Sequence, residues 1–239
     1  MILEAVVFDM DGVMAETEGD GHRVAFNQAF QQAGIDAEWD WTAYGELLKI
    51  SGGKERMKAY FKDQPLPCPD DQRDAFIAEL HKKKTALFTA LIQNGKIPLR
   101  RGVRRFIESI IAANLKLALA TTSNEQSAHG LLTSLLGKEM HDRFDLILAG
   151  DIVKKKKPDA EIYRLAAERL QIDPALSFVI EDTANGLQAA LAAGFHVCIT
   201  KSAYSQHEEF TEAAFIVDDL ETGEITIEKL DIYIQENLP

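Results

Sequence analysis

Two carboxylates separated by one residue follow the first apolar segment of the chain. Asp9 and Asp11 lie in the run Phe8-Asp9-Met10-Asp11-Gly12-Val13, directly after the apolar residues 5–8. One carboxylate can attack phosphorus and form an aspartyl phosphate, while a second protonates the leaving oxygen and later deprotonates water. The structural alternative is a turn rich in Asp and Gly that only ends a strand.

Three further apolar segments, 115–120, 144–149 and 178–180, are each followed by groups suited to phosphate chemistry. These groups are Thr121 with Thr122, Lys157, and Glu181 with Asp182. Ligands of an open α/β sheet bind beyond the carboxyl ends of its strands, so the four sets should meet in one site. Each set alone also has a plainer interpretation: helix capping by Ser123, Asn124, Asp182 or Thr183, and a solvated basic run at 154–157. Pro158, after Lys157, is suited to an early helix position.

The acidic residues among these groups predict a magnesium site. Mg²⁺ prefers carboxylate, carbonyl and water oxygens. Asp9 and Asp182 would supply side chains, and Asp11 its backbone carbonyl. The sequence shows no His pair or Cys cluster typical of a soft-metal site, so the six histidines are expected to be structural or surface residues.

The apolar segments do not alternate with polar residues, as expected for strands buried on both faces. A further segment, 195–199, and a last one, 215–217, follow them, with helical patterns at 162–170, 187–191 and 227–234. This alternation predicts an α/β fold with a doubly wound, Rossmann-like parallel sheet. Residues 16–95 contain only helical patterns, notably 16–33 and 70–93, and predict an inserted helical domain. The core would then comprise 1–15 and 96–239.

The amino-acid composition limits the classes of partner that this protein can have. The formal net charge of −12 disfavours nucleic acid, and no apolar run is long enough to cross a membrane. The two cysteines, far apart in sequence, suit a reducing cytoplasm better than a disulfide framework. We expect a cytoplasmic monomer that acts on a small phosphorylated sugar.

Read together, the four sets resemble the four motifs of the haloacid dehalogenase superfamily, and the helical insert resembles the cap of its β-phosphoglucomutase-like subfamily. The resemblance implies that Asp9 is the nucleophile and Asp11 the general acid and base. It also implies that Thr121 and Lys157 hold the phosphoryl group, and that Mg²⁺ is bound by Asp9 and the pair Glu181-Asp182. Pro158-Asp159-Ala160-Glu161 departs from the family's usual Pro-x-Pro-Asp, which removes no catalytic group.

A closer resemblance is to the CbbY-type proteins, which include xylulose-1,5-bisphosphate phosphatases that remove a misfire product of Rubisco. It rests on three segments of the predicted insert: 15–18, 22–27 and 47–57. The resemblance implies substrate contacts from Glu16, His22, Arg23, Lys54 and Arg56. Lys54 and Arg56 would hold a distal phosphate; alternatively, Gly52-Gly53 only separates two helices and 54–57 begins the second.

Other functions remain open at this level. A sugar phosphomutase would use the same residues, and a non-catalytic binding protein could share the fold. Haloalkanoate dehalogenation fits less well, because that branch lacks the second Asp of the first motif. Phosphonate cleavage through Lys54 fits less well because Asp11 is retained. A nucleotide P-loop is excluded, since Gly53-Lys54 lacks its required neighbours.

Overall fold

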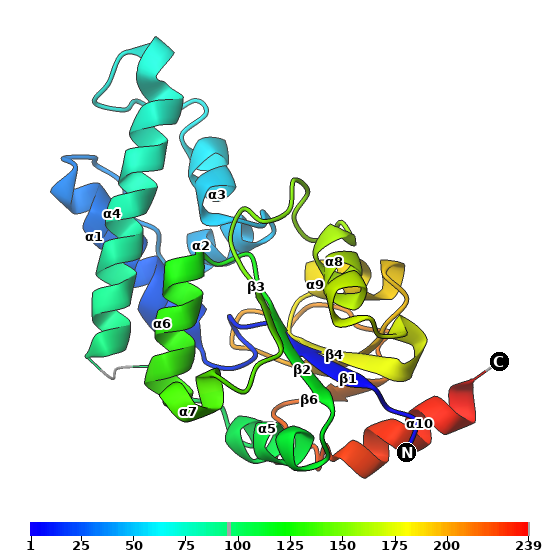
Figure 1. The fold of residues 1–239 in the computed structure, drawn as a ribbon. Coiled ribbons are helices and arrows are strands. Elements are labelled where there is room, and N and C mark those ends of the chain that lie inside the picture. The colour runs from blue at the N-terminus through cyan, green and yellow to red at the C-terminus, as the bar shows by residue number, and fades with distance from the viewer. Residues whose placement is uncertain (95–96, 239) are drawn as a thin grey trace.

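The sheet that organises the core has six parallel strands in the order β3-β2-β1-β4-β5-β6 (Figure 1). The computed structural model describes residues 1–94 and 97–238. The strands are β1 (Ala5–Phe8), β2 (Lys116–Ala120), β3 (Leu146–Leu148), β4 (Ser177–Glu181), β5 (His196–Thr200) and β6 (Phe215–Val217). All six strands predicted from the apolar segments are therefore confirmed, and β1, which carries Asp9 at its end, lies in the middle of the sheet.

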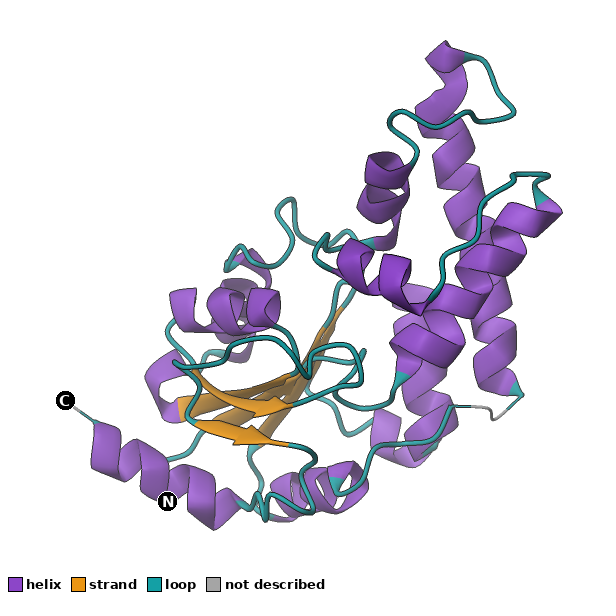
Figure 2. Cartoon of the chain, turned by 180° about the vertical axis from the view of Figure 1, so that it is seen from behind, coloured by secondary structure: helices purple, strands orange, loops and turns teal. Residues whose placement is uncertain are grey.

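Helices cover both faces of the sheet (Figure 2). One face packs against α5 (Val103–Ala112), α6 (Glu125–Leu136) and α10 (Ile227–Asn237). The other packs against α8 (Glu161–Leu170) and α9 (Ala184–Ala192). The short elements α7 (Lys138–His141) and η3 (Pro174–Leu176) complete the core. The doubly wound α/β fold is confirmed, and its buried central strands explain why their sequences do not alternate.

Between β1 and α5 the chain forms a separate group of helices, here called the helical insert. It comprises η1 (Glu18–Arg23), α1 (Val24–Gln32), α2 (Trp41–Leu48), α3 (Gly53–Tyr60), η2 (Asp70–Gln72) and α4 (Arg73–Gln93). The insert has its own apolar cluster, centred on Phe26, Phe30 and Trp39. It stands over one end of the sheet, with α4 packed against α6 (Figure 1). The predicted return to the core, between residues 95 and 96, lies outside the described residues.

The predicted helix 16–33 differs from the structure at its start, where η1 is a π-helix before α1. A π-helix forms hydrogen bonds between residues five apart and has a wider turn than an α-helix. Thr17 and His22, five residues apart, would point well away from each other on an α-helix. Here both contact the side chain of Asp11. The π turn is therefore what brings these two side chains to one carboxylate.

The chain passes between the core and the insert twice, and Arg100 holds these two crossings together. Ala15 forms an antiparallel bridge with Leu99, and the amide of Arg100 donates to the carbonyl of Met14 over 2.8 Å. The guanidinium of Arg100 pairs with Glu16 at 3.4 Å. It also donates to the backbone carbonyls of Gly12, Thr200, Lys201 and Asp218. One side chain thus ties both crossings to the loop that follows β1.

None of the helices in the described residues combines the length and apolar character that a membrane crossing demands.

Candidate active site

The polar groups that end the strands meet at one cavity of about 320 Å³ between the sheet and the helical insert. The core contributes Asp9, Asp11, Thr121, Thr122, Lys157, Glu181 and Asp182 to its wall. The insert contributes Glu18 and Arg56 from the opposite side. The parallel sheet explains the convergence, because the carboxyl ends of β1, β2 and β4 open on the same edge.

Lys157 lies at the centre of the buried charges, with 6% of its surface exposed. Its Nζ donates to Asp9 Oδ1 over 2.6 Å, to Glu181 Oε1 over 2.5 Å and to the carbonyl of Ala120 over 3.1 Å. Burial alone would lower the pKa of this amine, but Asp9 and Glu181 raise it well above its usual value. Lys157 is therefore a fixed cation beside the candidate nucleophile.

The remaining charge in this cluster is negative. Burial raises the pKa of Asp9 well above its ordinary range; Lys157 opposes this shift and Glu181 adds to it. Burial, followed by Glu181 and Asp9, likewise raises the pKa of Asp182. Lys157 pairs with only two of these three buried carboxylates, so the cluster would be stabilised by a further cation.

The donor set fits a magnesium ion. Asp9, Glu181 and Asp182 each offer an oxygen, and these three atoms lie within 4.8 Å of one another. Mg²⁺ is bound in proteins by one or two carboxylates and several further oxygens. Asp9 and Asp182 are the carboxylates best placed to bind it.

Glu181 belongs to the acidic cluster, but its oxygens already accept hydrogen bonds. Oε1 accepts from Lys157 and from the hydroxyl of Tyr163, the latter over 2.7 Å. Oε2 accepts from the amide of Asp182 over 2.9 Å. We therefore assign Glu181 to holding Lys157 in place rather than to direct metal binding.

Gly12 is required by the close approach of the metal-site carboxylate. A Cβ at this position would lie 2.0 Å from Asp182 Oδ2. Its φ of 81° is also in the left-handed region that glycine adopts readily. The glycine after Asp11 therefore lets the loop pass directly over Asp182.

Asp11 lies in a different environment from Asp9. Its carboxylate accepts hydrogen bonds from the hydroxyls of Thr17 and Ser123 and from His22 Nε2, the last over 3.0 Å. Burial would raise the pKa of Asp11, but His22 and these hydrogen bonds hold it well below its usual range. The two shifts have the opposite sign from those of an ionised nucleophile beside a protonated acid, so a cation bound beside Asp9 would be needed to keep that carboxylate ionised.

Lys84 extends this network into the insert. Its Nζ lies 2.7 Å from His22 Nδ1, over the rings of Phe26 and Phe88. An ammonium can only donate, so protonated Lys84 leaves His22 Nε2 to carry the hydrogen that faces Asp11. Burial lowers the pKa of Lys84 to about 7, against the opposing effect of Glu18 and Asp11. Lys84 thus orients His22, which in turn orients Asp11.

We expect Lys84→Met to lower kcat for phosphate release about tenfold, because one hydrogen bond to a charged group is lost. Wild-type kcat should fall as pH rises through about 7, where Lys84 loses its charge, and the variant should lack this fall. Steady-state kinetics across pH measure both effects. Lys83→Met, on the exposed side of α4, is the matched control and should behave as wild type. An unchanged pH profile in Lys84→Met would contradict the assignment.

The structure places the predicted residues of the insert unevenly. Arg56 lines the cavity, and its guanidinium donates to the hydroxyl of Tyr44 over 2.8 Å. Lys54 does not line the cavity and instead pairs with Asp151 of the core. Arg23 also lies outside it, with its guanidinium 5.1 Å from the centre of the Trp41 ring.

The structure also decides four smaller points of the sequence interpretation. Asn124, not Ser123, caps α6, and Thr183, not Asp182, caps α9. Ser123 and Asp182 are therefore available to the site. Pro158 is not an early helix residue, because α8 begins at Glu161. Glu16 lies at the chain crossing with Arg100, outside the cavity.

Sequence reasoning assigned no role in the site to Thr17, Ser123, Lys84 or Tyr163. Lys84 had a readable signal: Ile77, Leu80, Lys84 and Phe88 recur at helical spacing, and all are buried on one face of α4. A lysine buried on the apolar face of a helix needs a hydrogen-bonding partner for its amine. The neighbouring Lys82 and Lys83, by contrast, are exposed to solvent.

Comparison with known proteins agrees with this geometry. Residues 3–194 match the family model of the haloacid dehalogenase-like hydrolases. A CBBY-like protein of Arabidopsis thaliana is 44% identical over 95% of this chain and 72% of its own. A crystal structure of CbbY from Rhodobacter sphaeroides in complex with phosphate has a TM-score of 0.89 and 39% identity, over 96% of this chain and 99% of that one. A mutant of the same protein, in complex with xylulose-1,5-bisphosphate, has a TM-score of 0.88 and 39% identity, with the same coverage.

These matches cover nearly the whole chain, including the helical insert. The chain belongs to the haloacid dehalogenase-like hydrolases and is a CbbY-like phosphatase.

Proposed function

We propose that this protein hydrolyses one phosphate of a sugar bisphosphate, xylulose-1,5-bisphosphate, through an aspartyl phosphate on Asp9. The observation that carries this proposal is that Asp9 and Asp11 line a cavity to which the core and the insert each contribute a buried cation. Lys157 supplies the cation on the core side, and Arg56 supplies it on the insert side. A bisphosphate needs both cations, one for each of its phosphate groups.

The residues of the site divide the reaction between them. Asp9 attacks phosphorus in line, and Asp11 gives a proton to the departing sugar oxygen. Asp11 then takes a proton from the water that cleaves the aspartyl phosphate, which restores Asp9. Lys157 balances charge on the transferred phosphoryl group, and the Thr121 hydroxyl and neighbouring amides hold its oxygens. When bound, Mg²⁺ would neutralise further charge between Asp9, Asp182 and the phosphoryl oxygens.

We further propose that residues 16–95 act as a cap that closes over the sugar. The support is that η1 and α3 supply Glu18 and Arg56 to a cavity whose chemistry belongs to the core, and that His22 of η1 bonds to Asp11. Closure of such a unit excludes water from the reacting groups. The substrate itself is supported by the solved CbbY complex with xylulose-1,5-bisphosphate.

Phosphate release with Mg²⁺ from four sugar phosphates tests the function. The substrates are xylulose-1,5-bisphosphate, ribulose-1,5-bisphosphate, β-glucose-1-phosphate and β-glucose-1,6-bisphosphate. We expect selective turnover of the xylulose compound, and none after chelation of the metal. Equal turnover of all four compounds would contradict the proposed substrate. Formation of glucose-6-phosphate without release of free phosphate would instead indicate a mutase.

Arg56→Met should raise KM for xylulose-1,5-bisphosphate about tenfold or more, because a charge-assisted hydrogen bond to the distal phosphate is lost. It should change KM for p-nitrophenyl phosphate much less, since that substrate lacks a second phosphate. Lys54→Met is the matched control: its amine pairs with Asp151 outside the cavity, so both KM values should stay near wild type. Equal effects of Arg56→Met on both substrates would remove Arg56 from the distal site.

A further inference from the structure

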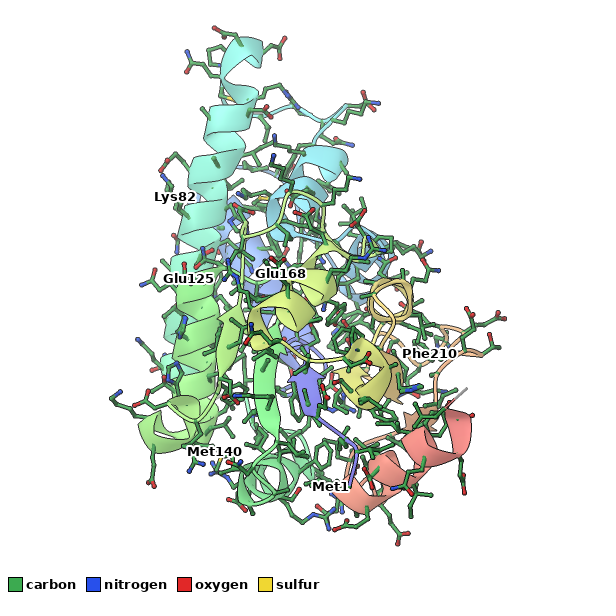
Figure 3. All side chains as sticks on the ribbon, turned by 45° about the vertical axis from the view of Figure 1, so that its right-hand side comes forward. Met1, Lys82, Glu125, Met140, Glu168 and Phe210 are labelled. Atoms are coloured by element: carbon green, nitrogen blue, oxygen red, sulfur yellow. The ribbon has the colours of Figure 1, made fainter. Side chains whose placement is uncertain are left out.

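Two histidines outside the active site face each other on the surface of the core. Gly137 joins α6 to α7, and the turn brings His129 and His141 together. The Nδ1 atom of His129 lies 2.8 Å from the Nε2 atom of His141. Figure 3 locates the region by Glu125, the first residue of α6, and Met140 in α7. The sequence predicts no histidine pair, because only the turn makes neighbours of residues twelve apart.

A carboxylate fixes the protonation of this pair. The Nδ1 atom of His141 lies 2.9 Å from Asp142 Oδ1, and Lys138 holds the other oxygen of Asp142 at 2.6 Å. A carboxylate accepts only, so Nδ1 of His141 carries the hydrogen and its Nε2 presents a lone pair to His129. Histidines that bind metals commonly donate their second ring nitrogen to a carboxylate in this way. His141 is therefore already in the form of a metal ligand.

The second histidine needs only to change its tautomer. His129 donates Nδ1–H to His141 in the neutral pair, and Nδ1 becomes a ligand once its hydrogen has moved, by way of solvent, to Nε2 of the same ring. Zinc binds imidazole nitrogen at about 2.0–2.1 Å, so a tetrahedral angle requires the two nitrogens to be about 3.3 Å apart. Binding therefore requires the two rings to turn and open the present 2.8 Å to that value. Both rings are partly exposed, with 19% of the His141 side chain accessible, so an ion can reach them.

We propose that His129 and His141 form a binding site for a divalent transition metal, with zinc as its ion. The ion accepts one lone pair from each ring, the ring hydrogen of His129 moves from Nδ1 to Nε2 by way of solvent, and two of the ion's waters are displaced. Within the described chain, no third carboxylate, histidine or cysteine completes a cluster with these two, so water fills the other positions. Imidazole favours zinc, nickel and copper, whereas the acidic cluster of Asp9 and Asp182 favours magnesium. The two sites thus select different metals.

Calorimetric titration of the full chain with Zn²⁺, in saturating Mg²⁺, tests this site. Wild type should show one more zinc-binding event than either His129→Gln or His141→Gln. Asp142→Asn keeps both ligands and should weaken that event about tenfold or more, because the tautomer of His141 is no longer fixed. His196→Gln is the matched control: its ring faces the carbonyl of Ala175, and it should bind zinc as wild type does.

Ring-nitrogen NMR spectra place the ion independently of affinity. Zinc should shift Nδ1 of His129 and Nε2 of His141 in the wild type. Equal zinc binding by wild type and both histidine variants, or ring signals that zinc leaves unmoved, would overturn the proposal. Thermal melting curves confirm that each variant is folded before it is titrated. None of these readouts depends on the phosphatase substrate.

Discussion

Asp9→Asn should reduce phosphate release by about 10⁴-fold or more, to the level of residual catalysis by the remaining site. The amide cannot attack phosphorus, and the other groups cannot replace it, because Lys157 is a cation and the carboxylate oxygens of Asp11 are held by hydrogen bonds from His22 and Ser123. The variant should remain folded. Burial and Glu181 raise the pKa of Asp9, so the ionised side chain is unfavourable there, and a neutral amide relieves that repulsion.

Steady-state phosphate release and a thermal melting curve check both parts of this prediction. Asp36→Asn, an exposed residue of the insert, is the matched control and should leave both unchanged. Turnover of Asp9→Asn within tenfold of wild type would rule out Asp9 as the nucleophile. A lowered melting temperature with lost activity would show instead that the pair with Lys157 stabilises the fold.

Asp11→Asn should lower kcat for the sugar bisphosphate about 10²–10⁴-fold, the usual contribution of a general acid or base. The amide oxygen can still accept from Thr17 and His22, and the Ser123 hydroxyl, which bonds to the other oxygen of Asp11, can accept from the amide nitrogen, so the local structure should persist. p-Nitrophenyl phosphate separates the two roles of Asp11. Its leaving group needs no proton, so Asp9 should still be phosphorylated, but the slow attack of water should leave the aspartyl phosphate in place.

A rapid-mixing measurement should therefore show one equivalent of p-nitrophenol released quickly by Asp11→Asn, followed by slow turnover. Ser123→Ala, which removes a hydrogen bond to Asp11 but keeps the carboxylate, should lose about tenfold or less and show no such burst. Fast steady turnover of p-nitrophenyl phosphate by Asp11→Asn would show that Asp11 does not activate water.

The sheet and the groups at its strand ends were predictable because each depends on a short stretch of sequence. A buried parallel strand is a run of apolar residues, and the edge at which it ends is set by chain direction. Asp9, Thr121 and Asp182 therefore came together in the structure as the strand pattern indicated. The beginning of α1 was not predictable in the same way, since an α-helix and a π turn share similar residue preferences.

Contacts between the insert and the core required the structure. Lys54 of the insert pairs with Asp151 of the core across 97 positions of the sequence, and Glu55 pairs with Lys156 across 101. Such pairs depend on how two separately packed units meet, and neither partner carries a local mark of the other. The resemblance placed Lys54 and Arg56 together on one segment, but the helical turn of α3 sends only Arg56 into the cavity.

Because Arg100 holds both chain crossings, the pKa of Asp11 reports the position of the insert relative to the core. Arg100 holds the carbonyl of Gly12 and thereby fixes the loop of Asp11 to the core. Ser123 is also part of the core, whereas His22 belongs to η1. Any swing of η1 away from the sheet must break the bond from His22 while that from Ser123 stays. The pKa of Asp11 then rises toward its ordinary value, so a measurement of that pKa tells whether η1 is docked against the core.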